Sequence, residues 1–185
     1  MKSLPGNVNQ EDYVNPYARP SGTSFGVRDI NGDGFLEFPA VTLLPGLSGE
    51  AELDSTSYMV EWQAVTKTMG SQTVLRALMN PRENYWFRLP FRLQGRVCAV
   101  NDPKLRTVTY TEVIPGEDGG GLLGGTLFSI RVFTQSSWES RGETSGYVRL
   151  AEQNDSVYGI QILTKDEELR QYVEDIAGGF QLMAE

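Results

Sequence analysis

Short runs of alternating apolar and polar residues, separated by turn-forming residues, fill most of the chain. In the clearest run, "YMVEWQAVT", Val60 and Trp62 alternate with Glu61 and Gln63. A period of two residues is typical of a strand that is buried on one face. Turn signals separate such runs at intervals of roughly eight to twelve residues, which favours an antiparallel, mainly meandering β-sheet over parallel βαβ units. The expected strands are residues 23–30, 34–44, 58–66, 72–79, 84–93, 95–100, 106–114, 126–134, 146–153 and 156–164.

One segment near the end of the chain has a helical period instead. Thr164 and Glu167 have the spacing of a capping box at its start, and Gly178 and Gly179 supply a stop. The predicted fold class is therefore α+β: an antiparallel sheet with a C-terminal amphipathic helix packed on one face. The apolar stripe of this helix consists of Leu169, Tyr172, Val173, Ile176 and Phe180.

The chain divides into three predicted parts. Residues 1–22 are polar and contain prolines, with no apolar stretch typical of a secretory signal, so we expect a linker there. Residues 23–50 form a predicted β-hairpin around a polar loop, and residues 51–185 form the predicted α+β domain. We expect the chain to be the carboxyl-terminal part of a larger protein. No apolar run of about 18 residues is present, so we expect no transmembrane segment.

The polar loop "DINGDGFLEF", residues 29–38, places oxygen-bearing side chains at alternate positions. Asp29, Asn31 and Asp33 converge if the chain turns tightly between them, and a glycine relieves the bend. This spacing is typical of a calcium loop. An open alternative is a plain turn, because Asn-Gly and Asp-Gly are also strong hairpin turn signals.

The same loop is not an EF-hand. Counted from Asp29 as the first position, the twelfth is Ala40, where an EF-hand has a bidentate glutamate, and Pro39 precedes it. The stretch "VRDINGDGFLEF" instead resembles the calcium motif of FG-GAP/VCBS-type repeats, and the chain carries one visible copy. That resemblance implies a structural Ca²⁺ held by the side chains of Asp29, Asn31, Asp33 and Glu37 and by the backbone carbonyl of Phe35.

The region from residue 71 onward carries a second resemblance. Its order of runs, "YWFRLPFRLQGRVCAV", "RTVTYTEV", a glycine loop, "LFSIRVF" and a closing helix, looks like C-terminal domains of uncharacterised lipoproteins from gut clostridia. The order also resembles the PsbP/Mog1-like α+β arrangement. Both resemblances imply a binding or assembly role and carry no catalytic motif.

The residues that are absent exclude several kinds of chemistry. The chain has no histidine and a single cysteine, Cys98, so it can form neither a histidine-dependent triad nor an internal disulfide nor a thiolate zinc site. We expect Cys98 to be a small buried residue. The formal net charge of -8 repels phosphate backbones, so we expect no nucleic-acid partner.

The glycine run "GGGLLG", residues 119–124, matches the dinucleotide-binding pattern letter for letter. The pattern requires a strand immediately before it and a helix after it. Here a proline-containing turn precedes it and a predicted strand follows. We therefore expect a flexible loop between strands.

These features predict a non-catalytic module and not an enzyme. We expect a monomeric binding or assembly domain of a secreted or lipid-anchored protein at the surface of a Gram-positive bacterium, with a protein or glycan as partner. A cytoplasmic assembly factor of the Mog1 kind is a further possibility. The main alternative is an accessory domain of a carbohydrate- or peptidoglycan-active enzyme. Its candidate residues are the acids Glu61, Glu83, Glu112 and Glu139 and the aromatics Trp62, Tyr85, Trp86, Trp138, Tyr147 and Tyr158.

Overall fold

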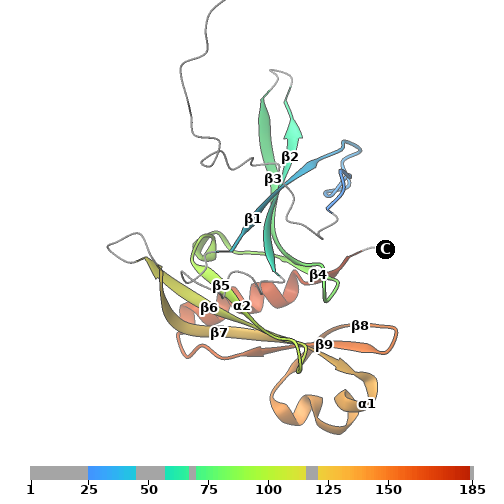
Figure 1. The fold of residues 1–185 in the computed structure, drawn as a ribbon, viewed down its shortest axis with the longest axis vertical. Helices are drawn as coiled ribbons and strands as arrows, with labels where there is room; N and C mark the ends of the chain where they lie inside the picture. The colour runs from blue at the N-terminus through green and yellow to red at the C-terminus, as the bar shows by residue number, and fades with distance from the viewer. Residues whose placement is uncertain (1–24, 45–56, 67–69, 116–120, 184–185) are drawn as a thin grey trace, which may run out of the picture.

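Two five-stranded antiparallel sheets make up the protein in the computed structural model (Figure 1). The structure describes residues 25–44, 57–66, 70–115 and 121–183, so the predicted linker at residues 1–22 lies outside the described residues. The strand order is β1-β2-β3-β4-β10 in the first sheet and β5-β6-β7-β9-β8 in the second. All pairings between described strands are antiparallel, as predicted.

Most described strands overlap the predicted runs. The predicted strand at residues 23–30 is an exception, because its described part contributes only a single bridge, and β10 was not predicted. The first sheet contains β1 (Phe38–Leu43), β2 (Tyr58–Val65), β3 (Ser71–Asn80), β4 (Tyr85–Arg88) and β10 (Gln181–Leu182). The second sheet contains β5 (Val97–Asp102), β6 (Thr107–Pro115), β7 (Gly121–Thr134), β8 (Val148–Gln153) and β9 (Ser156–Ile162). The helical elements are η2 (Phe91–Leu93), α1 (Gln135–Ser137), the π-helical turn η3 (Trp138–Gly142), η4 (Glu143–Ser145) and α2 (Glu167–Gly178).

The predicted α+β class was wrong. Strands make up 53% of the structure and helical residues 19%, and the strands form two sheets instead of one. A helix does form where the periodicity predicted it, but α2 has only 12 residues. It contacts β4, β7 and β9 without forming a layer of its own. The protein is therefore β-rich, with two short α-helices among the described elements.

Two sheets arise because the chain leaves the first sheet after β4. The run 84–93 was predicted as one strand, but β4 ends at Arg88. Pro90 has no N–H to offer a strand ladder, and Leu93 closes a 3₁₀ turn by donating its N–H to the Pro90 carbonyl at 2.9 Å. The next strand, β5, then pairs with β6 and starts the second sheet.

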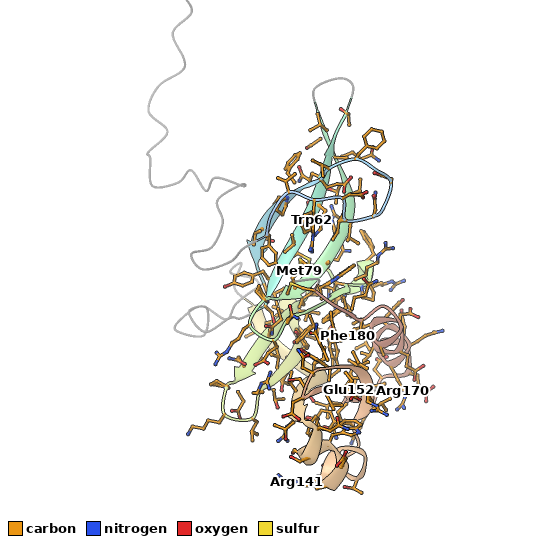
Figure 2. All side chains as sticks on the ribbon, turned by 90° about the vertical axis from the view of Figure 1, so that its right-hand side faces the viewer. Trp62, Met79, Arg141, Glu152, Arg170 and Phe180 are labelled. Carbon is orange, nitrogen blue, oxygen red and sulfur yellow. The ribbon has the colours of Figure 1, made fainter. Side chains whose placement is uncertain are left out.

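The larger hydrophobic core lies between the sheets and takes side chains from both and from α2. Phe180, just after α2, lies in this region (Figure 2), with its ring centroid 5.3 Å from that of Tyr85 and 5.8 Å from that of Tyr158. The predicted apolar stripe of the helix is confirmed, since all five of its residues belong to this core or pack against it. The fully buried members of the larger core are Leu78, Tyr85, Phe87, Leu93, Val97, Val108, Tyr110, Leu127, Phe128, Ile130, Ile160, Val173 and Ile176.

A buried polar network joins the two sheets inside this core. The Tyr85 hydroxyl of the first sheet lies 2.8 Å from the Tyr110 hydroxyl of the second. The Asn80 amide donates to the Tyr85 hydroxyl at 3.3 Å, and Ser57 Oγ lies 3.2 Å from the Tyr110 hydroxyl. Burial raises the pKa of Tyr110 to about 12 and raises the pKa of Tyr85 well above its ordinary value.

Three local features were predicted from the sequence: the burial of Cys98, the start of α2 and the glycine loop before β7. Cys98 is buried, as predicted. The capping box was placed two residues too early, because the N-cap of α2 is Asp166, whose carboxylate accepts the Leu169 N–H at 3.0 Å. The glycine loop is shorter than predicted: β7 starts at Gly121, in register with the end of β6, and residues 116–120 lie outside the described residues.

Candidate functional site

The polar loop is closed at its base by one β-bridge. The Arg28 N–H donates to the Glu37 carbonyl at 3.1 Å, and the Glu37 N–H donates to the Arg28 carbonyl at 2.9 Å. Within residues 25–44, the described part of the predicted hairpin, the two arms share only this bridge, because the following strand, β1, pairs with β2 of the first sheet. Gly32 and Gly34 turn the loop with φ angles of 77° and 87°, which favour glycine.

The Asp29 carboxylate organises the backbone of the loop. Its oxygens accept the N–H groups of Gly32 at 2.7 Å, Gly34 at 2.8 Å and Asp33 at 3.1 Å. These bonds, with the one from Gly34 foremost, lower the pKa of Asp29 because they stabilise its ionised form. The loop is therefore held in its curved shape around an ionised first position.

The next two predicted ligands hold each other. The Asn31 amide nitrogen donates to Asp33 Oδ2 at 2.8 Å, and Asn31 Oδ1 accepts the Asp33 N–H at 3.0 Å. Asp33 Oδ1 in turn accepts the Phe35 N–H at 2.9 Å. The structure therefore brings the first four predicted residues together in one hydrogen-bonded loop.

Glu37 differs from the other acids of the loop because it is fully buried. Its Oε2 accepts the Ile30 N–H at 3.0 Å, which ties it to the start of the loop. Its Oε1 is buried as well and has no hydrogen-bond partner. A buried carboxylate oxygen without a partner costs free energy, so this atom is the feature of the loop that most needs an explanation.

Two further residues at the base of the loop were not predicted from the sequence. The Arg28 guanidinium lies 5.0 Å from the centroid of the buried Trp62 ring, and burial lowers its pKa. Arg28 Nε and Trp62 Nε1 are both buried without partners. Five side-chain polar atoms in the described part of the chain are buried without a hydrogen-bond partner. Arg28 Nε, Trp62 Nε1 and Glu37 Oε1 are three of them. The sequence analysis placed Trp62 in a half-buried strand, but it did not predict the contact with Arg28, because that contact depends on how distant segments pack.

The donor set suits calcium in its chemistry. All five predicted ligands offer oxygen, which Ca²⁺ prefers, and a carboxylate oxygen that accepts one N–H retains a second lone pair. No group of three or more His, Cys, Asp or Glu residues is gathered closely enough to hold a metal ion within the described ranges. The Asn31 amide and the Phe35 carbonyl are oxygen donors of other types. Glu37 Oε1 is the oxygen in the set whose partner is missing, and a cation in the loop would supply it.

The residues of the alternative function are dispersed. Trp62, Tyr85, Trp86, Trp138 and Tyr158 are buried and do not make an exposed sugar-stacking platform. Three of the four candidate acids belong to ion pairs on different strands or turns. These pairs are Glu61 with Arg76 at 2.8 Å, Glu83 with Arg106 at 2.7 Å and Glu112 with Arg96 at 2.7 Å.

Comparisons with known proteins add no information on the function of this chain. No family model, curated protein or solved structure matches this chain. The resemblances seen in the sequence therefore stay predictions. None of the helices within the described residues is long and apolar enough to cross a membrane.

Proposed function

We propose that this chain is a non-catalytic binding or assembly module of a secreted or lipid-anchored surface protein of a Gram-positive bacterium, stabilised by calcium in the loop at residues 29–37. The observation that carries the proposal is the buried Glu37 carboxylate, whose Oε1 has no partner at the base of an acidic, preformed loop. The resemblance of the loop to FG-GAP/VCBS-type motifs supports the same assignment. The partner in this proposal is a protein or glycan at the cell surface.

The calcium in this proposal is structural. Asp29, Asn31, Asp33 and Glu37 would hold it with side-chain oxygens and Phe35 with its carbonyl. The ion supplies positive charge that offsets the three carboxylates. The chain's own groups keep the loop curved, through the Asp29 bonds to three N–H groups, and close its base through the Arg28–Glu37 bridge, next to the start of β1 at Phe38. A loop that surrounds its ion leaves no open position for a substrate, which favours a stabilising role.

Calorimetric titration of calcium into chelator-treated protein tests the proposal. We expect one ion to bind with a dissociation constant of about 10⁻⁴ to 10⁻³ M, the range of extracellular modules. Magnesium should bind more weakly, because it demands a smaller, near-octahedral site. Thermal melting in the same buffers should show a higher midpoint with calcium, since a ligand that binds the folded state stabilises it.

The matched variants are Asp33→Asn and Asp102→Asn. Both replace an exposed aspartate whose carboxylate accepts backbone N–H groups of a turn. Asp102, however, is the last residue of β5 and accepts the N–H groups of Lys104 and Leu105 in the turn that follows. Asp33→Asn should weaken calcium binding at least tenfold, and Asp102→Asn should leave it unchanged. The absence of binding up to about 10 mM calcium, well above the expected range, would refute the calcium site.

A further inference from the structure

A second candidate site lies far from the calcium loop, where the chain passes from β7 to β8. The helical elements α1, η3 and η4 form an excursion at the opposite end of the molecule from the β2–β3 tip (Figure 1). This excursion and β8 line an open cavity of about 360 Å³. Figure 2 shows Arg141, one of its lining residues, at this end of the molecule. The volume falls at the lower end of the range for small-molecule sites, which favours a ligand no larger than a dipeptide.

The wall of this cavity is fixed by tight packing. Trp138 is buried and packs edge-to-face on Phe133, with ring centroids 5.3 Å apart. Gly142 lies directly against the indole, since a Cβ at this position would meet Trp138 at 2.4 Å. The segment between them is a π-helical turn, a geometry that is rare and occurs frequently at functional sites. The cavity is therefore largely preformed and does not need a ligand to shape it.

The charges around the cavity are of both signs and do not neutralise one another. Glu139, Arg141 and Arg149 all line it, yet neither arginine forms an ion pair with Glu139. Glu139 accepts a hydrogen bond from Gln135 at 3.2 Å, and Arg149 pairs with Glu152 at 2.8 Å. Within the described part of the chain, Arg141 has no ion-pair partner.

This arrangement selects against ligands with a single charge. A simple anion attracted by Arg141 and Arg149 is repelled by Glu139. A simple cation attracted by Glu139 is repelled by the two arginines. A molecule with a carboxylate at one end and an ammonium at the other satisfies both groups. We propose that the cavity binds a zwitterion, an α-amino acid or a short peptide, whose carboxylate contacts the two arginines and whose ammonium contacts Glu139. This site is independent of the calcium loop.

Titration of the whole chain with four small probes tests this assignment. The probes are alanine, L-alanyl-L-alanine, N-acetylalanine without an ammonium, and alaninamide without a carboxylate. We expect at least one of the two zwitterions to bind, and each capped probe to bind at least tenfold more weakly than that zwitterion. Tighter binding of alanine indicates a free amino acid, and tighter binding of L-alanyl-L-alanine indicates a peptide. In either case, amide chemical-shift changes should be confined to residues 135–149.

Two variants and one control complete the test. Arg141→Gln and Glu139→Gln change exposed side chains, so the fold should be retained, and each should weaken zwitterion binding at least tenfold. Arg170→Gln is the matched control, because Arg170 is an exposed arginine that pairs with Glu174 at 3.3 Å on α2; it should bind the probe as tightly as the wild type. The proposal is overturned if neither zwitterion binds up to 10 mM, if N-acetylalanine binds as tightly as the zwitterions, or if both lining variants bind normally.

Discussion

At the scale of single residues, Glu37 combines two properties that conflict in the metal-free loop. It is an acid with no exposed surface, and one of its oxygens has no partner. Leaving a buried charged group incompletely paired costs more than a typical hydrogen bond contributes. If the loop binds calcium as proposed, this side chain would lower stability without the ion and contribute to it with the ion.

Replacing Glu37 by glutamine should separate these two effects. In chelator, Glu37→Gln should raise the free energy of unfolding by about 1 to 3 kcal/mol, because an amide, which cannot ionise, costs less to bury than an acid. In calcium, the variant should lose the stabilisation that the wild type gains. Urea unfolding with and without calcium measures both. A variant that is less stable in chelator and still responds to calcium would contradict the assignment. Glu174→Gln serves as the control, because the Glu174 side chain is exposed.

Two glycines offer a matched test of packing around the second candidate site. At Gly142 an added methyl group meets the Trp138 ring at 2.4 Å, whereas at Gly178, the last residue of α2, nothing lies within 4 Å. Gly142→Ala should lower the free energy of unfolding by about 1 to 3 kcal/mol through overpacking. Gly178→Ala should raise it by about 0.5 to 1 kcal/mol, since alanine favours the helix. Denaturant unfolding of both variants compares them; equal effects would contradict the packing argument.

At the scale of elements, the start of α2 rests on a side chain that the sequence pattern did not select. The Asp166 carboxylate accepts the Leu169 N–H. Before the helix, the Thr164 hydroxyl accepts the Asp166 N–H at 3.2 Å. The pattern Thr-x-x-Glu was read as a capping box, but Asp166 is the nearer oxygen-bearing side chain to the first free N–H groups. Several candidate caps in a row cannot be ranked without the backbone geometry.

Substitutions at the helix start distinguish the two caps. Asp166→Ala should lower the free energy of unfolding by about 1 kcal/mol, because the Leu169 N–H loses its acceptor. Glu167→Gln should change it by less than about 0.5 kcal/mol, as expected of an exposed side chain outside the cap. Thermal melting of both variants makes the comparison. A larger loss in Glu167→Gln than in Asp166→Ala would restore the capping box.

At the scale of the whole molecule, the contact between the two sheets includes the Tyr85–Tyr110 hydroxyl pair. The Tyr85 ring comes from the first sheet and the Tyr110 ring from the second, and both rings are fully buried. Because burial favours the neutral phenol, the pKa of Tyr110 is about 12 in the folded protein, against an ordinary value near 10. The unfolded chain therefore releases this proton at a lower pH than the folded chain does.

The stability of the protein should consequently fall in alkali. The contribution of Tyr110 is fully present below about pH 10 and is lost as the pH rises from about 10 to 12, a total of about 3 kcal/mol for a shift of two units. Tyr110→Phe should flatten this dependence, although it costs stability at neutral pH by removing a buried hydrogen bond. Urea unfolding between pH 8 and about 11.5 tests this. A dependence equally steep in Tyr110→Phe would mean that other groups cause it.

The sequence by itself determined where most strands lie and that their pairing is antiparallel, because alternation and turn residues act over a few neighbouring positions. It also determined the helical stripe at residues 169–180 and the composition of the polar loop. Only the tertiary structure decided that the strands form two sheets, since the choice of pairing partners after the break at Pro90 depends on how the strands meet in space. It alone buried Glu37 and Trp62 and formed the pocket lined by Arg141, because burial depends on how distant elements pack and not on local order.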